Sequence, residues 1–162
     1  MSREDAKNAK IFLEGDDVED RLAFRTFGAA LEVHRTLGPG FLESVYEEAL
    51  ALELTCRGIP FERQCPAVVE YKGRRVGEGR LDFLVDRKVV VELKAVEQLG
   101  EYHTAQVLSY LRATNCRLGL LLNFNAVLLR GGMRRVVLSR NSSRPSRLRG
   151  SPVWGQPGQP AR

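Results

Sequence analysis

Two apolar runs joined by a short polar link decide the fold of this chain: residues 79–94 read GRLDFLVDRKVVVELK. Each run has the apolar and β-branched composition of a strand, and the charged link DRK predicts a hairpin turn. Side chains alternate along a strand, so Glu92 and Lys94 leave the same face of the second run. The turn brings Asp82 of the first run alongside. The sequence therefore predicts that two carboxylates and one lysine converge.

This convergence has two interpretations. Two partly buried carboxylates about 4 Å apart repel by roughly 4 kcal/mol at an effective dielectric near 20, so they need a cation, a shared proton or a hydrogen-bond network. Lys94 alone would serve in an ordinary ion pair on a sheet face. Alternatively, the oxygens suit Mg²⁺, which would polarise a phosphoryl oxygen while Lys94 stabilises negative charge in the transition state. Spacing alone leaves both open, because acid-x-Lys motifs are common.

Length and composition predict one soluble domain. The chain has 162 residues, 43% of them hydrophobic, which suffices for one sizeable core. Residues 1–7 are charged and lead into no long apolar run, so we expect neither a signal peptide nor a membrane span, and a cytoplasmic location. Cys56, Cys65 and Cys116 lack Cys-x-x-Cys or Cys/His spacing. They predict reduced, buried thiols and disfavour zinc.

The positive charge lies at the carboxyl end of the chain. The net charge is +5, and residues 139–162 contain five arginines and no acid, so the remainder is formally neutral. This segment is also rich in Pro, Gly and Ser, a composition that builds no core. We therefore expect a flexible charged N-terminus (1–17), a folded domain (18–138) and a disordered basic tail (139–162). The tail is either a solubilising extension or a source of sequence-independent attraction to nucleic acid.

Hydrophobic periodicity predicts three helices and five strands in the folded part. The helices are expected at 18–36, 42–57 and 101–113, and the strands at 61–71, 75–85, 89–93, 118–123 and 134–138. We expect the inward face of the second helix to be formed by Leu42, Val45, Tyr46, Ala49, Leu50 and Leu54. That of the third helix is expected to be formed by Tyr102, Ala105, Leu108 and either Leu111 or Arg112. This order of elements predicts an α/β sandwich around a mixed sheet.

Several segments, taken in order, resemble the GxxExxY protein family, whose small uncharacterised members are assigned to the PD-(D/E)XK nuclease superfamily. The naming pattern is present as Gly40, Glu43 and Tyr46 within LGPGFLESVYE. The segments GRLD, VELKAV, AQVLSYL and LLLNF follow in order, and together the resemblance covers roughly residues 29–137. Each segment is weak alone, but the ordered set is specific.

The resemblance implies a restriction-endonuclease-like core, with a mixed β-sheet flanked by helices, and a divalent-metal-dependent nuclease that cuts DNA or RNA. It implies Mg²⁺, with Mn²⁺ as an alternative. Carried over by position, the implied catalytic residues are Glu43, Asp82, Glu92, Lys94 and Gln106. The implied metal ligands are Asp82, Glu92, Glu43 and the backbone carbonyl of Leu93. Tyr110, four residues after Gln106 and on the same helical face, would line the site.

Other polar residues near these motifs have less specific interpretations. Glu43 is also the kind of acid that a helix N-terminus favours. Arg80 shares strand parity with Asp82 and suits either a phosphate contact or an ion pair with that carboxylate. A lone helical histidine such as His103 is more often structural than a general base. Both tyrosines of the motifs fit core positions with locally bonded hydroxyls.

Two other classes of function stay open beside the nuclease. One is a catalytically silent nucleic-acid-binding or protein-interaction module, and the other is an oligomeric structural protein with a buried ionic network. Edge strands and an apolar helix surface allow a homodimer. The presence of the complete Asp, Glu-x-Lys and Gln-x-x-x-Tyr set favours the nuclease, because buried polar groups lower stability and a protein without a chemical function would be free to lose them. The neutral core is unlike that of proteins that grip long duplexes, which points to a short, single-stranded or partner-presented substrate.

Overall fold

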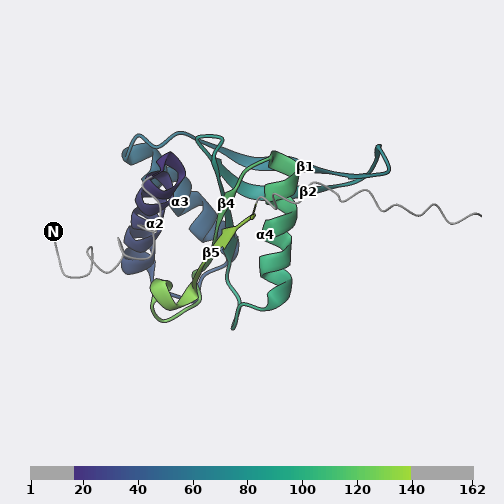
Figure 1. Ribbon diagram of the computed structural model, residues 1–162. Helices are drawn as coiled ribbons and strands as arrows, with labels where there is room; N and C mark the ends of the chain where they lie inside the picture. Colours follow the sequence, from purple (N-terminus) through teal and green to yellow (C-terminus); the bar gives the residue numbers. More distant parts are fainter. Residues whose placement is uncertain (1–16, 140–162) are drawn as a thin grey trace, which may run out of the picture.

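The computed structural model describes residues 17–139, which form three α-helices, one 3₁₀ helix and five strands (Figure 1). The elements are α2 (Val18–Leu37), α3 (Glu43–Cys56), β1 (Phe61–Tyr71), β2 (Arg74–Val85), β3 (Val89–Lys94), α4 (Glu101–Thr114), β4 (Leu118–Asn123), η1 (Leu129–Gly132) and β5 (Met133–Val137). Each expected helix and strand is present, with ends that differ by at most one residue. Residues 1–16 and 140–162 lie outside the described residues, and so do nearly all of the expected flexible N-terminus and basic tail.

The five strands form one mixed sheet in the order β1-β2-β3-β4-β5. Neighbouring strands are antiparallel except β3 and β4, which are parallel and are connected through α4. A parallel pair needs such a crossover, whereas the antiparallel pair β2–β3 needs only the short turn at residues 86–88. The predicted mixed sheet and the predicted turn are therefore confirmed.

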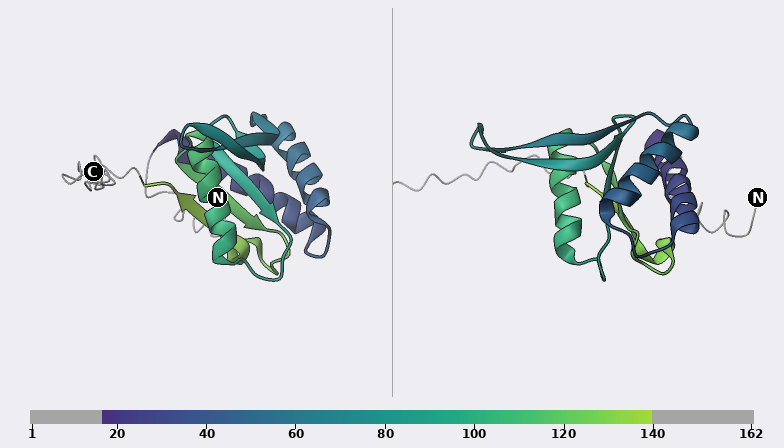
Figure 2. Two further views of the ribbon diagram at one scale, coloured as in Figure 1. Left: turned by 90° about the vertical axis from the view of Figure 1, so that its right-hand side faces the viewer. Right: turned by 180° about the vertical axis from the view of Figure 1, so that it is seen from behind.

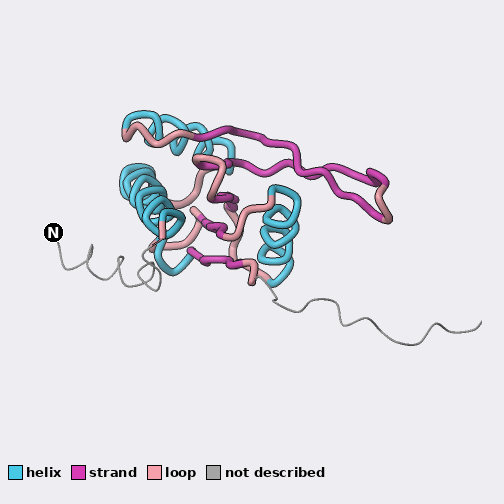
Figure 3. Tube along the Cα trace, turned by 45° about the horizontal axis from the view of Figure 1, so that its top comes forward, coloured by secondary structure: helices cyan, strands magenta, loops and turns pink. Residues whose placement is uncertain are grey.

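Helices cover both faces of the sheet (Figures 1 and 3). Val89, Val91 and Leu93 of β3 pack in one core cluster with residues of α2 and α3. Val90 belongs to a second cluster with residues of α4. Alternation along β3 therefore directs odd positions to the α2/α3 layer and even positions to α4. Glu92 and Lys94 are even, so they face α4.

Of the two helices on the first face, α3 buries its expected stripe only in part. Asp17 caps α2 by accepting a hydrogen bond from the Asp20 amide at 3.0 Å. In α3, the stripe of Tyr46, Leu50 and Leu54 is buried as predicted. The prediction was wrong for two further members of that stripe, which are exposed: Leu42 and Val45. Leu42 precedes the helix in an extended conformation. Val45 comes one residue before the buried Tyr46, so its side chain lies about 100° round the helix axis from that ring.

The second face is covered by a side of α4 that overlaps only in part with the one expected. Tyr102 and Ala105 are exposed, which corrects the expectation for them, whereas Leu108 is half-buried against the α4 cluster and Leu111 is buried. The buried residues of α4 are Val107, Tyr110 and Leu111. Their spacing is helical too, so the sequence contains two competing stripes. Gly119 of β4 selects between them, because a Cβ there would lie 2.7 Å from Val107 Cγ1 and the bare backbone lets α4 approach.

Two global expectations concern thiols and membranes. Cys65 and Cys116 are buried, but Cys56, at the end of α3, is exposed, which corrects the expectation for that residue. None of the helices formed by residues 17–139 is long and apolar enough to cross a lipid bilayer.

The β1–β2 hairpin extends well past α4 as a two-stranded projection, seen from two further sides in Figure 2. We call residues 68–80 the hairpin arm. Nearly all of its side chains are exposed, and a bulge between Val69 and Glu70 interrupts its strand pairing. The arm leaves the domain directly beyond Asp82, so its base adjoins the predicted site.

Candidate active site

Asp82 occupies the point where β2 and β3 separate. Ladder pairing between the two strands ends at Phe83 and Val91, one residue short of Asp82. In place of a backbone carbonyl, the Asp82 carboxylate accepts the Leu93 amide hydrogen, with 2.8 Å between Oδ2 and N. The Asp82 carboxylate thus lies between β2 and β3 at the point where the two strands separate.

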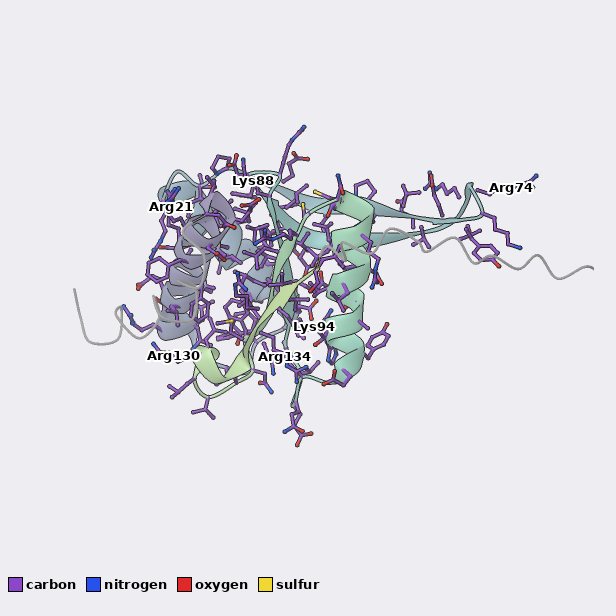
Figure 4. The ribbon with its side chains drawn as sticks, viewed as in Figure 1. Arg21, Arg74, Lys88, Lys94, Arg130 and Arg134 are labelled. Carbon is purple, nitrogen blue, oxygen red and sulfur yellow. The ribbon has the colours of Figure 1, made fainter. Side chains whose placement is uncertain are left out.

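Glu92 and Lys94 lie beside it on β3, on the side of the sheet that α4 covers. Lys94 Nζ donates to Glu92 Oε1 at 2.9 Å, and the side chains are only 14% and 4% exposed, respectively. Glu92 Oε2 lies 3.4 Å from the Asp82 amide nitrogen. Figure 4 places Lys94 between the sheet and α4. The structure therefore brings Asp82, Glu92 and Lys94 together.

Burial and mutual repulsion make both carboxyls weaker acids than usual. Burial raises the pKa of Asp82, the hydrogen bond from Leu93 partly offsets this, and the negative charge of Glu43 raises it further. Burial and the charge of Asp82 raise the pKa of Glu92 to about 7, against the hydrogen bond from Lys94. Glu92 therefore holds its proton to a higher pH than an exposed glutamate does.

The lysine of the site remains a cation. Burial alone would lower the pKa of Lys94, but its hydrogen bond to Glu92 and the charges of Glu92, Glu43 and Asp82 raise it above its ordinary value. A lysine that holds its proton donates hydrogen bonds and stabilises negative charge, and it does not act as a base.

Glu43 stands at the edge of this cluster. It is the first residue of α3 and is exposed, yet its charge acts on both Asp82 and Lys94. The loop before it is held by Tyr46, whose hydroxyl donates to the Gly38 carbonyl at 2.6 Å and accepts from the Phe41 amide at 3.1 Å. The tyrosine hydroxyl thus ties down the turn that leads into the helix carrying Glu43.

Gly40 supplies the backbone freedom that this turn needs. Its φ of +110° lies in the region that disfavours side chains, where glycine carries no penalty. Gly40 and Tyr46 of the GxxExxY pattern therefore fix the turn that places Glu43 at the start of α3.

Gln106 and Tyr110 approach from α4. Gln106 Nε2 donates to the Tyr110 hydroxyl at 3.1 Å, and its Oε1 is buried without a partner among the described residues. Burial, and then the charge of Glu92, raises the pKa of Tyr110, so this ring borders the site.

His103 accepts a hydrogen bond from the Gly100 amide at the start of α4, which is a structural role. Arg80 is exposed and makes no ion pair with Asp82 within residues 17–139.

Two residues that the sequence did not mark act on Asp82, Gln64 by direct contact and Glu47 through its charge. Gln64 of β1 donates through Nε2 to Glu47 Oε1 at 2.9 Å and to Asp82 Oδ1 at 3.4 Å. After burial, the charge of Glu47 is among the effects that raise the pKa of Asp82. Glu47 follows Glu43 by four positions, so helical spacing alone places both acids on one face of α3. No comparable signal marks Gln64.

The side chains of β1 and β2 change from one face of the sheet to the other at Gln64 and Asp82. Phe83 packs in the α2/α3 cluster, but Leu81 and Cys65 pack in the α4 cluster, although residues two apart normally share a face. Gln64 has φ +51°, a left-handed conformation that is costly for a side-chain-bearing residue. Strain of this kind is typical of functional sites.

This strain gives a direct prediction for Gln64. We expect Gln64→Gly to be more stable than Gln64→Ala by about 1 kcal/mol, because both lose the amide contacts but only glycine relaxes the backbone. Urea unfolding midpoints of the two variants provide the measurement, and the alanine variant is the matched control. An alanine variant as stable as the glycine variant would mean that the backbone at this position is unstrained.

Comparison with known proteins identifies the family. The family model of the PD-(D/E)XK nuclease superfamily matches residues 20–136, more than two thirds of the chain. The chain belongs to the PD-(D/E)XK nuclease superfamily. Its five-stranded mixed sheet with flanking helices is the restriction-endonuclease-like fold that the sequence predicted. No curated protein and no solved structure is similar enough to the chain to be matched.

Asp82 and Glu92 each have a carboxylate oxygen that could bind a hard cation. Each uses one oxygen in a strong hydrogen bond, Asp82 with Leu93 and Glu92 with Lys94. The second oxygen of each makes only a 3.4 Å contact, which is long for a hydrogen bond. Within residues 17–139, however, no three His, Cys, Asp or Glu side chains are gathered into a ready metal cluster. The donor set therefore suits an ion held by two carboxylates and waters, as Mg²⁺ often is.

Proposed function

We propose that this protein is a divalent-metal-dependent nuclease that hydrolyses phosphodiester bonds of DNA or RNA. One observation carries the proposal: in a chain of the PD-(D/E)XK nuclease superfamily, Asp82 and Glu92 are buried side by side next to Lys94. Such a pair of acids is electrostatically unfavourable in the metal-free protein, and a bound cation would relieve it.

We assign the roles by the contacts of each residue. Asp82, Glu92 and the carbonyl of Leu93 would hold Mg²⁺ or Mn²⁺, and Glu43 would complete the site from the start of α3. The ion would supply Lewis-acid stabilisation and a more acidic bound water. Lys94, held as a cation, would orient the attacking water and stabilise the charge that develops on phosphate.

Gln106 is the fifth residue that we place in the catalytic set. Its buried Oε1 has no partner among residues 17–139, and an unsatisfied acceptor of this kind costs stability unless a substrate or water group satisfies it. The amide nitrogen of Gln106 is held by its hydrogen bond to the Tyr110 hydroxyl. We expect the pair to line the path of the substrate.

We further propose that the protein is a member of the GxxExxY branch. The support is the turn before α3: Gly40 has the positive φ that it needs, the Tyr46 hydroxyl holds it by two hydrogen bonds, and Glu43 follows it, where its charge acts on Asp82.

A catalytically silent binding module is the second candidate. The observation in its favour is that no third acid joins Asp82 and Glu92 in a ready-made metal cluster within the described part of the chain. Under this proposal the fold and the polar groups would hold nucleic acid or a protein without turnover.

One assay separates the two candidates. Purified protein is incubated at pH 8, where Glu92 is ionised, with single- and double-stranded DNA and RNA in Mg²⁺, Mn²⁺ or EDTA. The nuclease proposal expects cleavage of at least one substrate with a metal and none with EDTA. The Asp82→Asn protein, purified identically, controls for contaminating nuclease. Binding without cleavage under every condition would favour the silent module and contradict the nuclease.

A further inference from the structure

The hairpin arm reaches far from the candidate active site. Its strands continue from Asp82 past the end of the helical layer, with the tip clear of the body of the domain (Figures 1 and 2). Arg74 lies eight residues from Asp82 along β2. At a strand rise of about 3.3 Å per residue, the tip stands roughly 25 Å from the carboxylates. Spacing along each strand of a DNA duplex is about 3.4 Å per nucleotide, so this reach corresponds to about seven or eight nucleotides of duplex.

The hairpin arm concentrates positive charge that the rest of the described domain lacks. Residues 70–80 contain four basic and two acidic side chains, whereas the other residues within 17–139 contain thirteen basic and fourteen acidic ones. Lys72, Arg74 and Arg75 cluster at the turn, and Glu78 pairs with Arg75. Figure 4 shows Arg74 pointing away from the domain.

An exposed aromatic ring accompanies these cations. Tyr71 is 64% exposed, and Lys72 Nζ lies 5.4 Å from its ring centroid. Basic side chains interleaved with an exposed aromatic ring form a surface that attracts phosphates and offers a platform for stacking. A two-stranded ribbon also has the dimensions to enter the major groove of a duplex.

The surface between the arm and the site is continuous. A groove of about 530 Å³ separates the base of the arm from the second half of α4, and Ser109, Tyr110 and Arg112 line its helical side. Tyr110 also borders the carboxylates, and its ring packs so closely on Gly79 that a Cβ there would lie 2.8 Å from it. The tyrosine therefore connects the site with the underside of the arm.

We propose that the tip of the hairpin arm binds the sugar–phosphate backbone of the nucleic acid about seven or eight nucleotides from the bond held at Asp82 and Glu92. The proposal rests on the proposed nuclease function and specifies how the substrate is held. It also accounts for a domain with almost no overall charge that acts on a polyanion, because the positive charge is gathered on one projecting element.

A second copy of the chain is the competing occupant of this arm. Val68, Val69 and Val76 are exposed on it, and β1 is an edge strand. Nucleic acid is favoured because the cations at the tip face solvent and complement phosphate. Against an identical tip they would repel.

Binding of a nucleic acid of defined length tests the proposal without any cleavage. All variants are made in an Asp82→Asn background and titrated, in EDTA, against fluorescein-labelled 30-nucleotide single-stranded DNA, single-stranded RNA and duplex DNA, and against a single-stranded 6-mer. The test variant is Lys72→Ala/Arg74→Ala/Arg75→Ala. The charge-matched control is Arg21→Ala/Arg25→Ala/Arg35→Ala on α2, at the other side of the molecule (Figure 4).

We expect the arm variant to bind at least one 30-mer about tenfold or more weakly at low salt, with the slope of log K against log [salt] reduced by about two or three. The 6-mer and the α2 control should show no such change. Equal affinity of arm variant and control for every 30-mer overturns the proposal, as does the absence of binding to any of them.

Sedimentation of the same proteins identifies the other occupant. If the arm variant converts a dimer into a monomer while its affinity for 30-mers is unchanged, the arm is a contact between copies and the proposal is wrong. Failure of the nuclease function would appear differently, as arm-dependent binding by a wild-type protein that cleaves nothing.

Discussion

Asp82→Asn is expected to lower metal-dependent cleavage by at least about 10³-fold while leaving the fold intact. Asparagine keeps the shape of the side chain, and its amide oxygen still accepts the Leu93 amide hydrogen, but the charge that would hold a cation is gone. Removing that charge also relieves repulsion with Glu92. We therefore expect a Tm at least equal to that of the wild type, together with a near-complete loss of the initial rate in Mg²⁺.

The same hairpin supplies a matched control for this variant. Asp86 lies four residues further along, at the β2–β3 turn, where it pairs with Lys88 at 2.7 Å in an exposed position. Asp86→Asn removes an identical charge near the site without touching the buried pair. It should retain nearly the full rate. An Asp82→Asn protein that keeps more than about a tenth of the wild-type rate would contradict the assigned role.

Lys94→Ala is expected to lower the free energy of unfolding at pH 8 by about 3 kcal/mol, because it leaves two buried carboxylates without their cation. The additional substitution Glu92→Gln should restore much of this loss by removing one of the charges. Urea denaturation of the two single variants, the double variant and the wild type measures the coupling. The exposed counterpart Lys88→Ala should cost less than about 1 kcal/mol.

The loss in Lys94→Ala should shrink as the pH falls. The folded-state pKa of Glu92 is raised, so protonation of this group stabilises the fold fully below its unfolded value near 4.5, and that contribution disappears as the pH rises through about 7. At pH 5.5 Glu92 is mostly neutral in the folded state, and the missing lysine matters less. A loss that stays constant between pH 5.5 and 8 would mean that Glu92 does not carry the charge that Lys94 neutralises.

Local patterns were enough to place the secondary structure. Strand alternation and the polar link at residues 86–88 placed Asp82 beside Glu92 and Lys94, and the structure has these three side chains adjacent. Such features depend on neighbours a few residues apart, whose geometry within a strand or tight turn is nearly invariant. The same reasoning explains why the ends of helices and strands agree so closely with the structure.

Packing between elements decided what these patterns left open. The sequence offers two apolar stripes on α4, and the bare backbone of Gly119 admits the one that carries Val107. Val45 is apolar, as a core residue would be, but its side chain is exposed on α3. Both outcomes depend on how the helices pack on the sheet, which periodicity within one element does not report.

By itself, then, the sequence determined the strands, the turn between them and the meeting of the acid, acid and lysine, because these follow from backbone geometry over a few residues. Only the tertiary structure decided that the side chains of the two strands change faces at Gln64, beside Asp82, that Gln64 links Glu47 to the same carboxylate, and that the hairpin arm stands clear of the domain. Those features arise where strands separate and helices dock, and there the balance of contacts across the whole fold outweighs local preference.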